Sequence, residues 1–330
     1  MAPKVSIIIP NFNHINYLPQ RLDSVFNQTY QDFEVILLDD ASTDGSADIL
    51  KTYQNHPNVS HVILNTVNSG GPFKQWKKGI ELAKGKYIWI AESDDVAHTF
   101  FLEETVKFAE SKQDLGLVFV ASEVINKDDK LKEKKMKPAS KTTGFTIESL
   151  EDISNYLIKE QSIPNASGVL FNTKILESIN LIDLENFRNT GDRYAYIQIA
   201  LKSKIYFLDD ALNYFRMHGL NTTKRNKVNN KLYYDRLLIV EGVIPSFVGN
   251  KFACANLKQF YFKQIFICLK AGFLKKVNSV NYKMFKYGLI SFGDFLILLF
   301  LSLFSMIFQK KLPYRIKNYY KIRFLDESFS

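Results

Sequence analysis

Short apolar runs alternate with helical stretches along the first third of the chain, and this alternation constrains the fold more than any other feature. The apolar runs occupy residues 5–9, 34–38, 59–64, 87–91 and 116–121. The stretches between them, at 17–27, 46–54, 73–84 and 100–111, carry apolar residues at helical spacing. Short strands joined by amphipathic helices form a mostly parallel sheet covered by helices. The pattern therefore predicts an α/β fold.

Polar clusters lie just past the ends of four of these runs. They are Asn11–Asn13, Asp39–Asp40, Asn68–Gly71 and Glu92–Asp95. In a parallel sheet the carboxyl ends of the strands share one edge, and ligands bind beyond that edge. Each cluster alone also fits an ordinary polar turn. Four clusters at one edge predict a ligand site.

Carboxylates dominate this predicted site. Asp94 and Asp95 are adjacent at a strand end, and Glu92 precedes them by two residues. Neighbouring carboxylates repel each other, and a hard divalent cation shared with phosphate oxygens relieves that repulsion. The arrangement predicts Mg²⁺ or Mn²⁺ together with a nucleotide diphosphate, while a helix cap is the alternative interpretation of an Asp-Asp pair.

Composition and motifs exclude several other classes of protein. Of the 330 residues, 46% are hydrophobic and 23% are charged, which suits a packed core and argues against disorder. Two cysteines are too few for a disulfide framework or a four-ligand zinc site. The dinucleotide, P-loop and nucleophile-elbow glycine patterns are missing from the sequence, as is any recognisable nucleic-acid module. We therefore expect no nucleic-acid partner.

The C-terminal part of the chain differs in charge and pattern from the rest. Residues 251–330 hold 14 of the 43 Lys and Arg but three of the 34 Asp and Glu. The uncharged stretch 295–308 follows Lys286 and precedes Lys310 and Lys311. A spanning helix needs about 20 apolar residues, so contact with the membrane interface fits this length better. The sequence predicts a membrane-contact segment at 287–311, with a buried helix of a C-terminal bundle as the alternative.

The start of the chain bears on its location. The apolar run at 5–9 is short, and no cleavage site follows it, so we expect no secretory signal. Together with the basic C-terminal region, this predicts a cytoplasmic protein that lies peripherally on the cytoplasmic face of the cell membrane.

Three segments resemble glycosyltransferase family 2. They are VSIIIPNFN at 5–13, FEVILLDDASTDGS at 33–46 and GKYIWIAESDD at 85–95. The resemblance implies a GT-A fold over residues 1–225 and an inverting enzyme with a nucleotide-sugar donor. For residues 226–330 the sequence pattern, rich in Tyr, Phe, Leu and Lys, predicts a helical, basic and apolar region.

The resemblance further implies which residues bind that donor. Asp40 would accept a hydrogen bond from a pyrimidine ring, which suits uridine, and Asp94 would lie by the ribose and diphosphate. The residues expected on the nucleotide sugar are Pro10, Phe12, Asn13, Asp40, Asn68, Lys74 and Asp94.

The sequence departs from the family pattern at two places. Many relatives carry Ala-Arg-Asn where this chain has Gln75-Trp76-Lys77, so Lys74 or Lys77 would replace the arginine as a point charge on the diphosphate. Glu-Ser-Asp-Asp also replaces the usual Asp-x-Asp, which leaves the role of Glu92 open.

Metal binding and catalysis are implied in the same way. Asp95 would ligate Mn²⁺ or Mg²⁺ directly, and His218 would reach the metal or the diphosphate, with a structural histidine as the alternative. Thr190-Gly191-Asp192 resembles the element that carries the catalytic base, so Asp192 would take the acceptor proton. A helix cap is the alternative role of Asp192. The other four histidines, His14, His56, His61 and His98, are expected at ordinary surface or core positions.

Taken together, these features predict transfer of a hexose or N-acetylhexosamine from a UDP-sugar in surface polysaccharide synthesis. The acceptor would be a saccharide carried on a polyprenyl diphosphate, by analogy and from the basic C-terminus. Two other classes stay open. One is a nucleotidyltransferase that makes a nucleotide sugar, and the other is a non-catalytic, membrane-associated scaffold.

Overall fold

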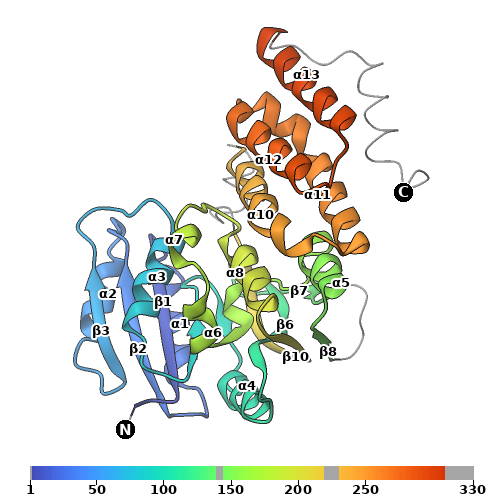
Figure 1. The fold of residues 1–330 in the computed structure, drawn as a ribbon. Coiled ribbons are helices and arrows are strands. Elements are labelled where there is room, and N and C mark those ends of the chain that lie inside the picture. The colour runs from blue at the N-terminus through green and yellow to red at the C-terminus, as the bar shows by residue number, and fades with distance from the viewer. Residues whose placement is uncertain (1, 139–143, 219–229, 309–330) are drawn as a thin grey trace. The chain divides into compact units, whose positions relative to one another are not determined.

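The computed structural model describes residues 2–138, 144–218 and 230–308 (Figure 1). The chain divides into two compact units. The first contains Met1–Glu148 and Gln161–Asn221, and the second contains Ser149–Glu160 and Thr222–Ser330. Lys310 and Lys311, at the basic end of the predicted membrane-contact segment, lie outside the described residues.

The first unit is built on a ten-stranded mixed sheet. Its strands are β1 Val5–Asn11, β2 Phe33–Asp39, β3 Val59–Leu64, β4 Tyr87–Ile90, β5 Val96–Ala97, β6 Leu115–Asn126, β7 Leu131–Met136, β8 Phe145–Ile147, β9 Val169–Asn172 and β10 Lys204–Met217. They lie in the order β3-β2-β1-β4-β9-β6-β10-β5, with β7 beside β6 and β8 beside β10. The pairs β1–β2, β2–β3, β1–β4 and β6–β10 are parallel.

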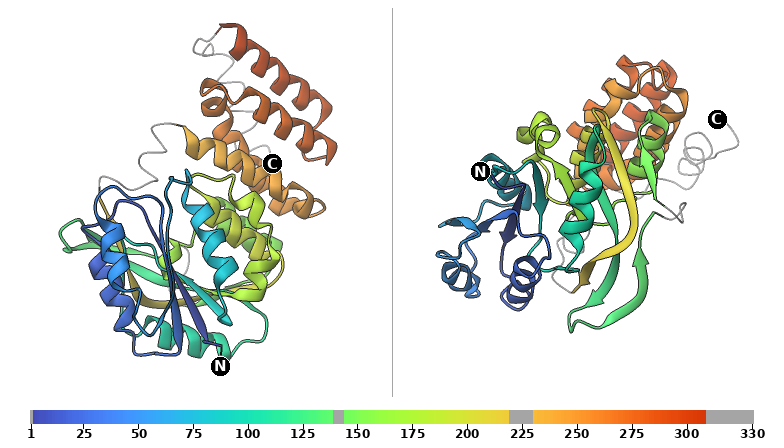
Figure 2. Two further views of the ribbon diagram at one scale, coloured as in Figure 1. Left: turned by 90° about the vertical axis from the view of Figure 1, so that its left-hand side faces the viewer. Right: turned by 90° about the horizontal axis from the view of Figure 1, so that it is seen from below.

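Helices cover both faces of this sheet (Figure 2). Helices α1 (Leu18–Phe26), α2 (Ser46–Thr52) and α4 (Phe101–Glu110) share one apolar cluster with Ile7 and Ile9 of β1. Ile8 points to the opposite face, because side chains alternate along a strand. There α3 (Pro72–Leu82) packs so closely that a Cβ at Gly79 would lie 2.4 Å from Ile8 Cγ2. The remaining α-helices of this unit are α6 Thr173–Ser178, α7 Leu181–Leu184 and α8 Gly191–Ala200.

The predicted α/β fold is therefore confirmed, and the central strands β1, β2 and β4 follow the predicted apolar runs. β10 is an addition, because the sequence analysis predicts no strand over 204–217. It is the longest strand in the described part of the chain, and register shifts interrupt its pairing with β6 between Leu208 and Asn213.

The second unit is helical, as the C-terminal pattern predicts. It contains α5 Leu150–Asp152 and the π-helix η1 Ile153–Lys159, then α10 Lys231–Phe247, α11 Lys251–Lys270, α12 Leu274–Lys286 and α13 Phe292–Phe308. Apolar side chains from α10, α11 and α12 are buried, among them Val240, Leu257 and Val277. Within residues 2–138, 144–218 and 230–308, each helix is too short or too polar to cross a membrane.

Candidate functional site

The polar clusters of the first unit meet at one edge of the sheet. β2 and β4 lie on either side of β1 and both run parallel to it, so the carboxyl ends of the three strands lie together. The loop after β1 is bound to the loop after β2, because Asn13 Oδ1 accepts a hydrogen bond from the backbone N–H of Thr43 at 2.8 Å. Beyond β4 follows Glu92–Asp95, which we call the acidic turn.

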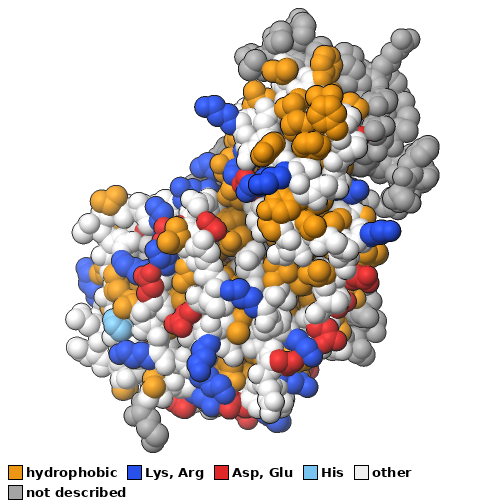
Figure 3. Space-filling view, viewed as in Figure 1, with side chains coloured by type: hydrophobic (Ala, Val, Ile, Leu, Met, Phe, Trp, Pro, Cys, Tyr) orange, Lys and Arg blue, Asp and Glu red, His pale blue; other side chains and the backbone are white. Residues whose placement is uncertain are grey.

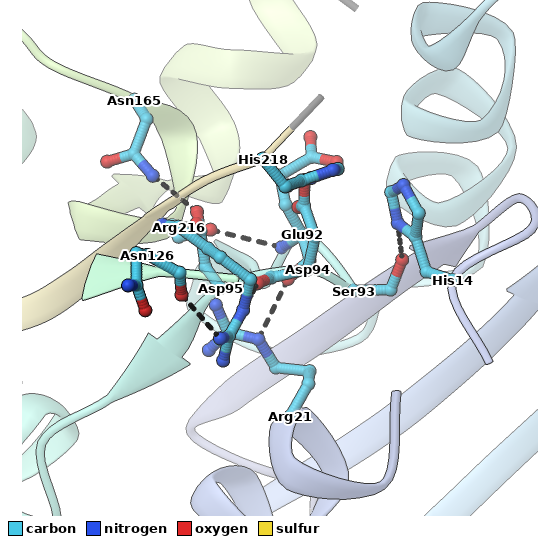
Figure 4. A network of polar contacts seen from close by, with 11 residues as sticks. His14, Arg21, Glu92, Ser93, Asp94, Asp95, Asn126, Asn165, Arg216 and His218 are labelled. Atoms are coloured by element: carbon cyan, nitrogen blue, oxygen red, sulfur yellow. Dashed lines mark hydrogen bonds and ion pairs between the residues drawn. The ribbon is translucent and has the colours of Figure 1, made fainter. Parts of the chain in front are cut away.

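Asp94 lies beside two histidines (Figure 4). Its Oδ2 is 2.9 Å from Nε2 of His218, and its side chain is 17% exposed. His14, in the loop after β1, is held through Nδ1 by Ser93 Oγ at 2.8 Å. One ligand atom from each of His14, Asp94 and His218 lies within 4.8 Å of the other two. A carboxylate with two imidazoles suits Mn²⁺ better than Mg²⁺, which prefers oxygen ligands alone.

The pKa values of Asp94 and His14 in this cluster are both lowered. Burial raises the pKa of Asp94, but the hydrogen bond with His218 and the nearby charges of His14 and His218 outweigh burial, so the pKa lies below its usual value. Burial lowers the pKa of His14 more than the charge of Asp94 raises it. A charged carboxylate and neutral imidazoles are the forms that ligate metals.

Asp95, unlike Asp94, is enclosed by protein groups that occupy both of its carboxylate oxygens. It is 2% exposed, and both carboxylate oxygens are hydrogen bonded to protein. The backbone N–H of Arg216 donates to Oδ1 at 2.8 Å, and Asn165 Nδ2 donates to Oδ2 at 2.5 Å. Burial and the charge of Asp94 raise the pKa of Asp95 to about 7. The family resemblance implies Asp95 as the direct ligand, whereas the group with ligand geometry contains Asp94 and not Asp95.

Glu92 and Trp76, the two departures from the family pattern, contact each other. Trp76 Nε1, on α3, donates a hydrogen bond to Glu92 Oε1 at 2.9 Å. Burial and the charge of Asp94 raise the pKa of Glu92 to about 8, although the hydrogen bond from Trp76 lowers it; the charges of Asp95 and Asp192 add to the rise. Glu92 is thus turned toward α3 and is held there by a neutral donor.

Asp192 stands at the start of α8. Thr190 is the N-cap residue, so Asp192 is the second helical residue rather than the cap. Its Oδ1 accepts a hydrogen bond from the backbone N–H of Arg193 at 2.7 Å. A Cβ at Gly191 would lie 2.8 Å from the ring of Phe73, so only glycine lets α8 begin this close to α3. The charge of Asp192 also contributes to the raised pKa of Glu92.

Asp40 organises the loop between β3 and α3. Its carboxylate accepts four hydrogen bonds at 2.8 Å from neutral donors, namely Asn65 Nδ2, Ser69 N–H, Ser69 Oγ and Gln75 Nε2. Asn68 belongs to the same loop, where its Nδ2 donates to the backbone oxygen of Asp40 at 2.9 Å. Its Oδ1 accepts from the N–H of Gly70 at 2.8 Å. Both predicted donor-binding residues therefore hold this loop together.

The other predicted donor-binding residues surround the same edge. Pro10 lies in β1, Phe12 is 40% exposed, and Asn13 has a left-handed φ of 56°. Lys74 makes no hydrogen bond or ion pair with any residue that the structure describes. Lys77 is paired with Glu185 at 2.8 Å, which leaves Lys74 as the better placed of the two lysines for an anionic ligand.

Sequence reasoning missed three residues of this region. His14 is assigned an ordinary position because a single histidine has no ligand spacing in the sequence. Arg21 and Arg216, both buried, donate to backbone oxygens of the acidic turn (Figure 4). For Arg21 a signal exists, because it follows Leu18 by three residues and precedes Val25 by four, which places a charge on the buried face of α1.

Comparisons with known proteins bear on the family and the fold. The sequence profile described as glycosyl transferase family 2 matches residues 6–172, half of the chain. A poly(ribitol-phosphate) beta-glucosyltransferase of Bacillus spizizenii is 41% identical over 112 residues, which cover 33% of this chain and 18% of that protein. Matches to the curated relatives cover between 18% and 77% of their own lengths.

Solved structures share the fold at low sequence identity. S. aureus TarS 1-349 in complex with UDP-GlcNAc has a TM-score of 0.69 and 18% identity, and the match covers 97% of this chain and 90% of that one. Mannosyltransferase PcManGT from Pyrobaculum calidifontis, in complex with GDP-Man and Mn²⁺, has a TM-score of 0.54 and 16% identity, with 94% and 89% covered. The family profile spans the three predicted motifs and the acidic turn, and the chain therefore belongs to glycosyltransferase family 2.

Proposed function

We propose that this chain transfers a sugar from a UDP-sugar to a glycan acceptor with inversion, and that a divalent cation takes part. The observation that carries the proposal is the cluster of His14, Asp94 and His218 at the carboxyl edge of the sheet. The donor set fits Mn²⁺, and all three side chains would hold it. Bound there, such an ion supplies Lewis-acid neutralisation of the leaving diphosphate.

The chain's own residues would perform the other parts of the reaction. Asp192 would accept the proton of the acceptor hydroxyl as its oxygen attacks the anomeric carbon. The nucleoside diphosphate leaves from the opposite face of the sugar, so an α-linked donor gives a β-linked product without a covalent intermediate. Lys74 would add a point charge to the diphosphate. The loops held by Asp40 and Asn13 would contact the uridine.

The relatives support this choice of donor and product. UDP-GlcNAc is bound by TarS, whose fold this chain shares, and Mn²⁺ accompanies GDP-Man in PcManGT. A family relative in Bacillus spizizenii is named for beta-glucosyl transfer to poly(ribitol phosphate). These names favour a hexose or N-acetylhexosamine donor and an acceptor of the surface-polymer type, which we propose is lipid-linked.

Thermal unfolding with nucleoside diphosphates tests the donor and the metal together. We expect UDP with Mn²⁺ to raise the melting temperature of the wild type, more than GDP, CDP or dTDP, and to leave Asp94→Asn unchanged. Preference for another diphosphate would contradict the uridine assignment. Release of diphosphate from UTP and a sugar phosphate would favour a nucleotidyltransferase. No shift with any of the four, and no sugar transfer, would favour the scaffold.

We further propose that α13 contacts the lipid surface that carries the acceptor. Phe292, Leu296, Phe300 and Leu303 are 59%, 48%, 59% and 51% exposed, and their spacing of three or four residues puts them on one face of the helix. Figure 3 shows hydrophobic side chains gathered at the top of the view, over α13. Lys283 and Lys286, near the end of α12, would add attraction to anionic headgroups.

Flotation with lipid vesicles tests this contact. The wild type should float with phosphatidylglycerol-containing vesicles, and Leu296→Ser with Phe300→Ser should reduce the bound fraction about tenfold. Val67→Ser, which changes a 77% exposed apolar residue of the first unit, is the matched control. Unchanged flotation of the double variant would contradict lipid contact.

A further inference from the structure

Arg216 ties the acidic turn to several elements of the first unit. Its Nε donates to the backbone oxygen of Asp94 at 2.7 Å, and its own N–H donates to Asp95 Oδ1 at 2.8 Å. Its Nη1 donates to the backbone oxygen of Asn126 at 3.1 Å and pairs with Asp129 Oδ1, in the connection between β6 and β7. Its side chain is 1% exposed. One guanidinium thus joins β10, the acidic turn and the β6–β7 hairpin.

Arg21 supports the same turn from α1. Its Nε donates to the backbone oxygen of Glu92 at 2.8 Å, and its side chain is fully buried near the ring of Trp89. Burial lowers the pKa of Arg21 to about 10 while the charges of Asp95, Asp94 and Glu92 oppose the fall, so the guanidinium stays charged at neutral pH. Its Nη1 and Nη2 have no hydrogen-bond partner among the described residues. Arg21 therefore acts on the turn through one carbonyl and through its charge.

The two arginines fix complementary parts of the turn. Arg21 holds the carbonyl of its first residue and Arg216 that of its third, while the Arg216 N–H holds the carboxylate of the fourth. A turn held at these three points keeps Asp95 inward and leaves Asp94 to face His218. Arg216, near the end of β10, and His218, just past that end, bring both contacts to the turn from the same part of the chain.

The negative charge of the acidic turn gives a second reason for Arg21 and Arg216 to lie beside it. Three carboxyl groups within four residues repel one another, and burial increases the repulsion. A cation in the cluster of His14, Asp94 and His218 would compensate Asp94 from one side. Before it binds, the guanidinium groups of Arg21 and Arg216 are the buried cations that Figure 4 shows converging on the turn.

We infer that Arg21 and Arg216 are positioning residues of the metal site, which hold the acidic turn so that Asp94 faces His14 and His218 before a cation binds. This inference rests on the proposed function. Lysine cannot replace either arginine fully. At Arg216 an ammonium group keeps the charge but lacks the planar fork that reaches several acceptors at once, and at Arg21 it lacks the Nε–H that donates to the Glu92 carbonyl. Loss of these donors should therefore weaken metal binding more than nucleoside binding.

Calorimetric titration separates metal binding from nucleoside binding. UDP is titrated into the full chain at a series of Mn²⁺ concentrations and without metal, for the wild type, Arg21→Lys and Arg216→Lys. We expect the apparent Mn²⁺ affinity to fall about tenfold in each variant, while UDP affinity without metal stays within about twofold. Arg236→Lys, the same change at a partly buried arginine in the second unit, should leave both affinities unchanged.

A milder variant covers the case in which Arg216→Lys does not fold. Asp129→Asn removes the charge at the outer end of Arg216, at a residue that is 55% exposed and does not touch the turn. Its φ of 62° is one that asparagine tolerates. We expect Mn²⁺ affinity to fall about threefold.

The outcomes distinguish the inference from the proposed function. If the wild type binds UDP without any response to Mn²⁺, the proposed function fails. If the wild type responds to Mn²⁺, and all folded variants keep its Mn²⁺ affinity, the inference alone fails. Equal losses of metal-dependent and metal-free binding would make the arginines purely structural and would also overturn it.

Discussion

Two pairs of adjacent aspartates end two strands of the same sheet, and they are held in different ways. Asp39 ends β2 and Asp40 follows it, and within the described part of the chain every donor to their carboxylates is neutral: amide side chains, hydroxyls and backbone N–H groups. Asp94 and Asp95 follow β4 and lie among two histidines and two buried arginines. Loop residues use the hydrogen-bonding capacity of Asp39 and Asp40, whereas Asp94 and Asp95 lie among histidine and arginine side chains.

The difference indicates what each pair does. Neutral donors fix a carboxylate and leave its negative charge in place, which suits a rigid wall that recognises a base by hydrogen bonds. Imidazole nitrogens beside a carboxylate can ligate a metal ion, and buried arginines keep the remaining acids compensated. The same dipeptide therefore lies in a candidate base-binding loop at one strand end and in a candidate metal centre at the other.

The largest effect is expected at Asp94 and Asp95. Asp94→Asn removes the carboxylate of the candidate metal cluster, so sugar transfer in Mn²⁺ should fall about 1,000-fold. The matched change Asp95→Asn keeps a hydrogen-bonding side chain next to Asn165 and should cost about tenfold. Initial rates with UDP-sugars measure both. Equal losses would remove the distinction between the two acids.

A smaller loss, confined to turnover, is expected at α8. Asp192→Asn keeps the acceptor for the Arg193 N–H but cannot take a proton, so kcat should fall about 100-fold. The affinity for UDP with Mn²⁺ should not change, because Asp192 is not part of the candidate metal cluster. A normal kcat in this variant would leave Asp192 as a helix-terminal residue.

In the pair Asp39 and Asp40, whose hydrogen-bond donors are neutral, we expect a substitution to affect donor binding and stability. Asp40→Asn replaces an acceptor of four hydrogen bonds with a group that also donates, so the loop at 65–71 loses part of its support. The KM for the donor should rise about tenfold, and unfolding should require about 1–3 kcal/mol less. Donor kinetics and urea denaturation measure the two effects. A reduced response to Mn²⁺ at saturating UDP would contradict the division of roles.

The smallest effect is expected at Trp76, which holds the side chain of Glu92 beside α3. Trp76→Phe keeps an aromatic ring against Phe73 but removes the hydrogen bond to Glu92, so activity should fall about threefold. Phe73→Leu, which changes the neighbouring ring and not the hydrogen bond, is the control. If Glu92→Gln has a larger effect than Trp76→Phe, then Glu92 has a role beyond this contact.

The sheet edge could be predicted from the sequence because each central strand is short, apolar and ended by polar residues. Val5–Ile9 and Tyr87–Ala91 are such runs, and both lie in the predicted place. β10 could not be predicted in the same way. Its sequence contains Asp209 and Asp210 at the point where the register shifts, so it lacks the alternation that marks a strand.

The candidate metal cluster of His14, Asp94 and His218 could not be predicted as a whole, because its members come from three distant parts of the chain. His14 follows β1, Asp94 follows β4 and His218 follows β10, and no spacing in the sequence relates them. The family resemblance supplies Asp94 and His218, although it assigns the metal to Asp95. The side of the turn that each aspartate faces depends on Arg21 and Arg216, and tertiary structure decides that orientation.

Electron paramagnetic resonance of Mn²⁺, titrated into Asp94→Asn and Asp95→Asn in the presence of UDP, tests the central claim most directly. Asp95→Asn should bind one Mn²⁺ with an affinity within about tenfold of the wild type, because Asp95 faces the interior. Asp94→Asn should leave Mn²⁺ free in solution at the same concentrations. Tight binding by Asp94→Asn together with free Mn²⁺ in Asp95→Asn would contradict the account.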